Sequence, residues 1–290
     1  MKNLTKFILA TFSLVLVAPV AQAQNKWAAW MPKKPKIEAG IFLGASNYAG
    51  TLEENLFNYN YTLPGYGAMI KYNVTNKFSL RFGMDYGTIE DADSGANTLD
   101  RQKRNLSFKS SILDGYLAGE YYFATWSDRY RKFSQFYIFG GIGSFHFNPQ
   151  AYYQGKWYSL QPLHTEGQAT QEYPGREPYQ LNQLYIPFGA GARFTLSRNW
   201  YLNFEIRANK TFTDYLDDVS LTYASSDVLL AYGGPVAMAL ANRTAEKYPN
   251  SAADMTGLNR GSRSGRDDWF FFTGFTLTHT FRPKLHCGGF

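Results

Sequence analysis

The feature of this sequence that most constrains its fold is an alternation that recurs eight times between Lys36 and Phe281. Each run is about ten residues long, has an apolar or aromatic residue at every second position, and ends in a polar break. Transmembrane β-strands have this pattern, because ~9–11 tilted residues cross the hydrocarbon while successive side chains face lipid and lumen in turn. The clearest run sets Ile37, Ala39, Ile41, Leu43 and Ala45 against Glu38, Gly40, Phe42, Gly44 and Ser46. The sequence therefore predicts an all-β fold: an eight-stranded antiparallel transmembrane outer-membrane β-barrel with long extracellular loops.

The predicted strands and their connections indicate which end of the barrel faces which compartment. The strands are expected at 36–48, 64–74, 77–90, 109–123, 135–147, 183–196, 200–212 and 268–282. The connections at 75–76 and 197–199 are tight turns and 124–134 is intermediate, whereas 49–63, 91–108, 148–182 and 213–267 are long. In bacterial outer-membrane barrels the short turns and both termini lie in the periplasm. We therefore expect the four long connections to face outward.

The N-terminal residues predict export. Lys2 and Lys6 precede an apolar stretch at 7–17, and Ala21-Gln22-Ala23 follows, which is the layout of a cleavable secretory signal. We accordingly predict a signal peptide at 1–23, a periplasmic segment at 24–35, the barrel at 36–282 and a periplasmic tail at 283–290. The predicted location is the cell outer membrane, which the chain crosses several times.

Composition narrows the class of fold further. Aromatic residues make up 18% of the chain, with 22 Tyr, 23 Phe and 6 Trp. Membrane barrels place such residues in girdles at both lipid interfaces, where a ring can be apolar on one side and wet on the other. A periplasmic β-sandwich, the soluble alternative, would also alternate but would need less exposed aromatic surface. The single cysteine, Cys287, excludes an intramolecular disulfide framework and a cysteine zinc site.

The inward-facing positions predict a filled lumen. In the predicted register nine charged residues point inside: Glu38, Lys71, Arg81, Asp85, Asp114, Glu120, Arg193, Glu205 and Arg207. Five acids and four bases can neutralise one another, and an eight-stranded barrel is narrow enough for side chains to fill it. We therefore predict a lumenal charge network and no conduction. A proton path or an ion-binding site is the alternative for the same residues.

The histidines give no sign of a metal or catalytic site. None of His146, His164, His279 and His286 has a spacing typical of metal ligands. Some lipid-modifying barrels carry a His-x-Ser pair, but here His146 precedes Phe147-Asn148 and His279 precedes Thr280-Phe281. The sequence thus predicts no catalytic, metal or cofactor-binding residues, and neither a small-molecule substrate nor a nucleic acid as ligand. A lipid-modifying outer-membrane enzyme is kept as an alternative.

Three aspartates open the longest predicted loop. Asp214, Asp217 and Asp218 fall within five residues, but they lack the spacing, glycine and closing Glu of an EF-hand. A Ca²⁺ site is therefore the less favoured interpretation. We expect these carboxylates to cap local loop structure or to pair with the loop arginines Arg243, Arg260, Arg263 and Arg266.

Basic residues concentrate at the predicted periplasmic end. The segments assigned to that end contain one acid, Asp128, and eleven bases: Lys26, Lys33, Lys34, Lys36, Lys77, Arg129, Arg131, Lys132, Arg198, Arg282 and Lys284. Such charge separation attracts an acidic partner and raises the rate of encounter. The predicted partner-binding residues are Lys33, Lys34, Arg129, Arg131, Lys132, Arg198, Arg282 and Lys284. A ring of bases resting on lipid phosphates is the alternative.

Four strings of sequence resemble a known family. They are residues 38–48 (EAGIFLGASNY), 139–143 continuing to 147–151, 160–163 with 165–168, and 210–220 (KTFTDYLDDVS). Over about 38–281 the chain resembles the PorG-like outer-membrane barrels of the Bacteroidota type IX secretion system. The resemblance makes Asp214, Tyr215, Asp217 and Asp218 a family loop motif. It implies a non-enzymatic role in protein transport, in which the barrel anchors a periplasmic ring of PorK and PorN. A general structural or adhesive barrel of the same family is the remaining alternative.

Overall fold

The computed structural model describes residues 36–52, 61–96, 98–127, 133–248, 254–261 and 267–281. Eight long strands dominate it: β1 Lys36–Ala49, β2 Leu63–Asn73, β3 Phe78–Ala92, β4 Ser107–Ser127, β5 Phe133–Tyr153, β7 Asn182–Thr195, β8 Trp200–Thr211 and β9 Trp269–Phe281. These bounds lie close to the predicted ones, except in β4 and β5. The predicted signal peptide, N-terminal segment and C-terminal tail lie outside the described residues.

The strands form a closed antiparallel barrel. Along the sheet the order is β4-β3-β2-β1-β9-β8-β7-β5, and a further pairing of β4 with β5 joins the two ends. The first and last strands pair from Ile37 opposite Phe281 to Ala49 opposite Trp269. Closure leaves none of the eight strands with an unpaired edge, which is what a sheet in hydrocarbon requires. The predicted fold class is confirmed.

One glycine pair makes the closing seam possible. Gly44 of β1 lies opposite Gly274 of β9, and a Cβ on Gly274 would stand 2.4 Å from the Gly44 Cα. A Cβ on Gly44 would meet the Phe42 ring at 2.6 Å. The two bare backbones thus leave room for the inward-pointing Phe42 ring where the barrel closes.

The alternation in the sequence becomes two different surfaces. Inward positions carry charged, polar and aromatic side chains that are buried, whereas outward positions carry large apolar ones that are exposed. Members of the outward set are Ile41, Leu43, Ile70, Phe82, Leu117, Ile142, Leu184, Ile206 and Phe275, with Ile142 70% exposed. Exposure of so large an apolar belt to water would be unfavourable, and the belt matches the lipid-facing surface of a membrane barrel.

Two strands extend well beyond this belt. β4 and β5 each have 21 residues, and β5 continues into a short strand, β6 Lys156–Ser159, which pairs with its end. The prediction that β5 ends at 147 was therefore wrong by six residues. The extra pairing of β5 with β4 and β6 gives its backbone partners above the barrel, so the strand continues there.

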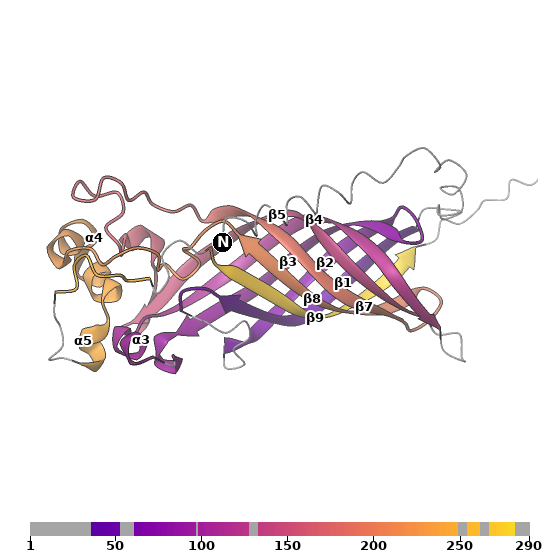
Figure 1. Cartoon of the computed structure of the whole chain (residues 1–290), viewed down its shortest axis with the longest axis horizontal. Helices are drawn as coiled ribbons and strands as arrows, with labels where there is room; N and C mark the ends of the chain where they lie inside the picture. Colours follow the sequence, from indigo (N-terminus) through magenta and orange to yellow (C-terminus); the bar gives the residue numbers. More distant parts are fainter. Residues whose placement is uncertain are drawn as a thin grey trace, which may run out of the picture.

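The long connections contain helices that the sequence analysis did not predict. They are η3 Asp93–Gly95, α3 Leu99–Arg104, η4 Gln161–Leu163, α4 Ser226–Ala241 and α5 Thr244–Lys247. Figure 1 shows α3, α4 and α5 gathered at one end of the barrel, opposite the end with the tight turns. Within the part of the chain that the structure describes, no helix combines the length and the apolar character needed to cross a membrane. We call the loop structure at the helical end the outer cap; it comprises 93–96, 98–106, 160–181, 213–248 and 254–261.

Candidate functional site: a filled lumen beneath an outer cap

The half of the lumen nearer the tight turns is filled by three ion pairs. Lys71 Nζ lies 2.5 Å from Glu120 Oε1, Arg81 Nη1 lies 2.7 Å from Glu205 Oε1, and Arg193 Nη2 lies 2.8 Å from Glu38 Oε1. The Tyr122 hydroxyl connects two of them, because it donates to Glu120 and accepts from Lys71 and Arg193. Side chains from six strands therefore meet on the barrel axis.

A second layer lies nearer the outer cap. The Arg207 guanidinium binds two carboxylates, with Nη1 2.6 Å from Asp85 Oδ2 and Nη2 3.0 Å from Asp114 Oδ2. Its carbon lies 4.4 Å from the centre of the Tyr116 ring and 4.8 Å from that of Phe272. All nine residues predicted to face the lumen thus lie in one of these two layers.

Burial makes this arrangement demanding. None of the nine side chains belongs to a residue more than 6% exposed. Charges withdrawn from water this completely are tolerated only when each has close, well-directed partners, and loss of one partner leaves another charge uncompensated. The network therefore holds the strands in one register as well as filling the space between them.

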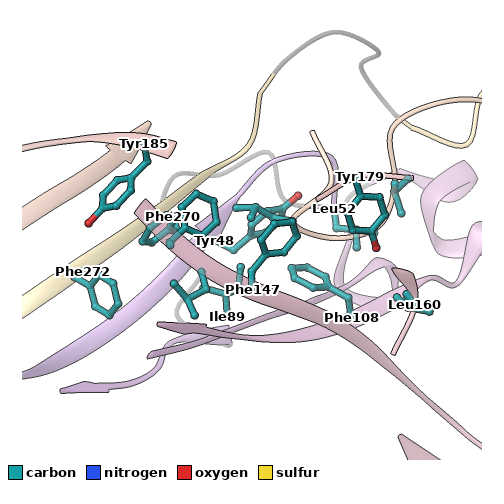
Figure 2. Packing of buried hydrophobic residues seen from close by; sticks show 14 of the residues in the cluster. Tyr48, Leu52, Ile89, Phe108, Phe147, Leu160, Tyr179, Tyr185, Phe270 and Phe272 are labelled. Atoms are coloured by element: carbon teal, nitrogen blue, oxygen red, sulfur yellow. The ribbon is translucent and has the colours of Figure 1, made fainter. Parts of the chain in front are cut away.

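Above the charged layers the lumen becomes apolar. Figure 2 shows the buried cluster extending from Phe272 and Tyr185 in the barrel to Leu160 and Tyr179 in the outer cap. The rings interlock edge to face, as in Phe270 against Phe272 at 5.9 Å. A cavity of about 10 Å³ beside Arg207 has room for roughly one water molecule. Charged pairs, aromatic rings and cap thus follow one another along the axis.

The outer cap has a polar centre built on Arg260. Its Nη1 lies 3.2 Å from Glu166 Oε1, and its Nη2 lies 3.5 Å from Asp218 Oδ2. Asp218 also accepts hydrogen bonds from Thr165 Oγ1 at 2.5 Å and from the Tyr179 hydroxyl at 2.7 Å. Burial raises the pKa of Asp218 to about 6, while Arg260 acts in the opposite direction. The expected pairing of the loop aspartates with an arginine is confirmed for this pair.

Other expectations for the loop arginines fare differently. Arg243 pairs with Glu246 at 3.0 Å and not with an aspartate, because both residues lie within or beside the short helix α5. Arg263 and Arg266 lie outside the described residues. In the part of the chain that the structure describes, no three His, Cys, Asp or Glu side chains are grouped so that they could hold a metal ion.

A second buried group of the cap joins both ends of the barrel sequence. The Tyr48 hydroxyl, at the end of β1, lies 2.7 Å from Asp217 Oδ2 and 3.1 Å from Asp268 Oδ1. Burial raises the pKa of Asp217 to about 7, and it raises the pKa of Asp268 well above its usual range, with Asp217 adding repulsion. The Tyr48 hydroxyl has only one proton to share between two buried carboxylates. The group of Tyr48, Asp217 and Asp268 is therefore most stable when one of the two carboxyl groups is protonated. Of the two remaining motif residues, Tyr215 stacks on Tyr179 at 4.6 Å, and Asp214 Oδ2 accepts a hydrogen bond from Ser220 Oγ at 2.9 Å.

The predicted partner-binding residues are mostly beyond the described part of the chain. Lys33, Lys34, Arg129, Arg131, Lys132, Arg282 and Lys284 lie outside it. Arg198 is described and lies in the turn between β7 and β8, where Leu196 N donates to Trp200 O. Thus Arg198 is at the end of the barrel away from the cap.

The structure draws attention to a pair of residues that the sequence analysis passed over. Ser144 and His146 are both exposed on the outward face of β5, and His146 Nδ1 lies 2.9 Å from Asn182 Oδ1 on β7. The pair has the order Ser-x-His, the reverse of the His-x-Ser motif that the sequence lacks at His146 and His279. Residues two apart on a strand face the same side in either order, so the spacing alone identifies this pair in the sequence.

A closed barrel with an apolar belt outside, charges inside and long structured connections at one end defines an outer-membrane β-barrel. The chain belongs to the family described as Domain of unknown function (DUF6089), whose sequence model matches residues 28–233. A comparison with curated proteins gives no match.

Among solved structures, similar barrels include the N-terminal domain of Pseudomonas aeruginosa OprF, with 11% identity, a TM-score of 0.33, and coverage of 86% of this chain and 100% of that one. The Neisserial surface protein A is similar at 9% identity, with a TM-score of 0.37 and coverage of 85% and 97%. For Ail of Yersinia pestis the identity is 8%, the TM-score 0.35 and the coverage 86% and 99%. The class assigned above rests on the strand topology, and the family rests on the sequence model.

Proposed function

We propose that this protein is a non-enzymatic, non-conducting outer-membrane barrel that anchors a periplasmic assembly. The observation that carries the proposal is the filled lumen, in which two charged layers and an aromatic layer succeed one another beneath the cap. A barrel closed in this way offers its two ends, and not its interior, to other molecules. The more specific proposal is an accessory role in the type IX secretion system, with the PorK and PorN ring as the partner.

Two further observations support a periplasmic partner. The segments that the sequence predicts to be periplasmic contain eleven Lys or Arg residues against one acid, which favours docking of an acidic surface. The family loop motif, which carries much of the resemblance to secretion barrels, is buried in the cap around Asp217 and Asp218. Its role is therefore to fold the cap, and partner binding is assigned to the opposite end.

A charge reversal tests the docking surface. Arg129, Arg131 and Lys132 occupy the connection between β4 and β5, and we expect their replacement by Glu to weaken recovery of the ring in a pull-down from detergent-solubilised outer membranes. Each exposed contact contributes only ~0.2–1 kcal/mol, so all three are changed together. Reversal of Lys103 and Lys247, exposed residues of the cap, is the control and should leave recovery unchanged. Wild-type recovery of PorK and PorN with the triple variant would instead favour bases that rest on lipid phosphates.

Planar-bilayer recording tests the closed lumen. The purified protein should show no steady conductance above background, because ion pairs fill the barrel axis and the cavity beside Arg207 holds only about one water molecule. Reproducible open-channel steps would mean that Arg81 and Arg207 line a pore.

A second candidate function follows from the Ser144 pair. Asn182 orients His146 through Nδ1, which leaves Nε2 available as a base. Ser144 and His146 share the outward face of β5 at the edge of the apolar belt, a placement that suits hydrolysis of a lipid ester. Ser144 Oγ attacks the carbonyl carbon, His146 passes the proton to the departing alcohol, and water then releases the fatty acid.

Mass spectrometry of lipopolysaccharide incubated with the solubilised protein tests this second candidate. Release of fatty acid by the wild type that stops in Ser144→Ala, but continues in the outward-facing control Ser111→Ala, would establish the enzyme. Absence of release by the wild type would leave the non-enzymatic proposal in place.

A further inference from the structure

The sheet that projects beyond the barrel has an outward face unlike the lipid-facing belt below it. Along β4 the outward residues change from Leu113 to Ser111 and Lys109, and along β5 they change from Ile142 to Ser144 and the polar residues that follow. We call the upper part of this surface the glycan face and define it by its residues: Glu90, Lys109, Asn148, Gln150, Tyr152, Trp157 and Ser159. It begins where the apolar belt ends.

Two aromatic rings form the centre of the glycan face. Tyr152 and Trp157 are a cross-strand pair of β5 and β6, with ring centres 5.4 Å apart and an interplanar angle of 59°. Tyr152 is 49% exposed and Trp157 is 50% exposed. Exposed aromatic pairs of this kind present flat apolar surface to solvent, and such a surface suits the C–H face of a sugar ring.

Polar groups border the two rings. The side-chain amides of Asn148 and Gln150 both donate to Ser159 Oγ, at 3.2 and 3.4 Å. Lys109 Nζ lies 5.8 Å from the centre of the Trp157 ring and 3.4 Å from Glu90 Oε2. Amides and a hydroxyl match the alternating donors and acceptors of a saccharide, and the ammonium group can bind a phosphate.

The opposite side of the same sheet is packed against the cap, which fixes the glycan face in place. Ala151 is buried in the main hydrophobic cluster, and Tyr153 and Tyr158 pack against it. Because neighbours on a strand alternate between faces, this packing holds Tyr152 and Trp157 outward. The face is therefore preorganised, and binding orders few side chains.

The height of the glycan face indicates its ligand. Lys109 lies four residues beyond Leu113 on β4, which is ~13 Å along a strand and ~10 Å along the membrane normal at the usual tilt. The polar headgroup layer extends ~5–8 Å beyond the hydrocarbon, so the face lies at and just above that layer. The headgroup of a lipid in the surrounding leaflet can therefore reach this face sideways.

We propose that the glycan face binds the phosphorylated sugar headgroup of an outer-leaflet glycolipid, of which lipopolysaccharide is the test case. The sugar stacks on Trp157 and Tyr152, the amides bind its hydroxyls, and Lys109 binds a phosphate. The proposal needs the barrel and its orientation, and it is independent of any role in secretion.

Binding to purified protein in nanodiscs tests the proposal with three probes: rough lipopolysaccharide, its deacylated oligosaccharide, and vesicles of phosphatidylglycerol. The double variant Tyr152→Ala with Trp157→Ala should bind lipopolysaccharide about tenfold more weakly, the loss expected of a stacking hot spot. Its binding to phosphatidylglycerol should be unchanged, because that lipid has no sugar ring to stack. The single variant Trp157→Phe, which keeps an aromatic ring at this position, should retain most of the affinity for lipopolysaccharide.

Trp200→Ala is the matched control, since Trp200 is 44% exposed at the opposite end of the barrel and packs against the His279 ring at an interplanar angle of 57°. It should bind lipopolysaccharide like the wild type. Heat-modifiable mobility on gels verifies that each variant is folded. Equal lipopolysaccharide affinity of the double variant and the wild type overturns the proposal, and so does an equal loss for phosphatidylglycerol. Oligosaccharide that binds more tightly than intact lipopolysaccharide also overturns it, by identifying a free glycan as the ligand.

Discussion

Replacement of Arg81 by Met is the sharpest test of the lumenal network. Arg81 is fully buried, and its Nη1 lies 2.7 Å from Glu205 and 3.6 Å from Glu120. Met keeps an unbranched apolar side chain but removes the charge, together with the guanidinium carbon that lies 4.1 Å from the centre of the Phe139 ring. The buried carboxylates of Glu205 and Glu120 then lose the positive charge that Arg81 supplies to both of them.

The expected loss follows from this geometry. Removal of one partner from a buried ion pair costs about 3–5 kcal/mol, chiefly because the other charge stays behind uncompensated. Combining Arg81→Met with Glu205→Gln removes that residual charge, so the double variant should be more stable than Arg81→Met alone. The coupling energy of such a cycle is expected to exceed about 1 kcal/mol.

Urea unfolding in lipid vesicles, followed by tryptophan fluorescence and by heat-modifiable gel mobility, measures these differences. The control is Lys210→Met, since the Lys210 pair with Asp267 has the same 2.7 Å separation but is 33% and 41% exposed. That variant should lose only ~0.2–1 kcal/mol. If Arg81→Met costs no more than Lys210→Met, the buried charges do not support the barrel in the way argued above.

Two other perturbations have defined outcomes. Gly274→Val should prevent closure, because its Cβ would stand 2.4 Å from the Gly44 Cα; the heat-modifiable band should be lost, and an intact band would refute the steric argument. Asp217 has a pKa raised from 3.8 to about 7, so the folded state holds its proton more tightly than the unfolded chain. The stability of the cap should therefore fall as pH rises from about 4 to about 7. Asp217→Asn should flatten this dependence, as measured by the melting temperature of the cap; an unchanged slope would identify another titrating group.

The barrel could be predicted from the sequence because its two environments are so different. Lipid on one side and a narrow lumen on the other make apolar and polar side chains alternate along every strand. Charged residues at the inward positions, such as Lys71 and Arg193, are therefore easy to recognise in the sequence. The register of one strand then follows from the next. For this reason all nine lumenal residues could be named in advance.

Apart from the pairing of Asp218 with Arg260, the outer cap could not be predicted in this way. Its helices and loops lie beyond the membrane, where no contrast between lipid and lumen imposes an alternation of apolar and polar residues. Its polar centre also joins residues that are far apart in the chain. Arg260 and Glu166, for example, are 94 residues apart. Helix α4 shows the same limit, because Gly234, with φ 76°, and Pro235 interrupt it while tertiary packing of Leu229 and Leu240 keeps it in place.

The contact between Tyr48 and Asp268 has a consequence for the order of events during folding. These residues are 220 apart in the sequence, and they meet only once the first and last strands have paired. The entropy of closing so long a loop makes such a contact late to form. Interactions made after the rate-limiting step chiefly slow unfolding. The cap thus acts as a latch on a completed barrel: it adds little to the speed of insertion, and it prolongs the lifetime of the inserted protein.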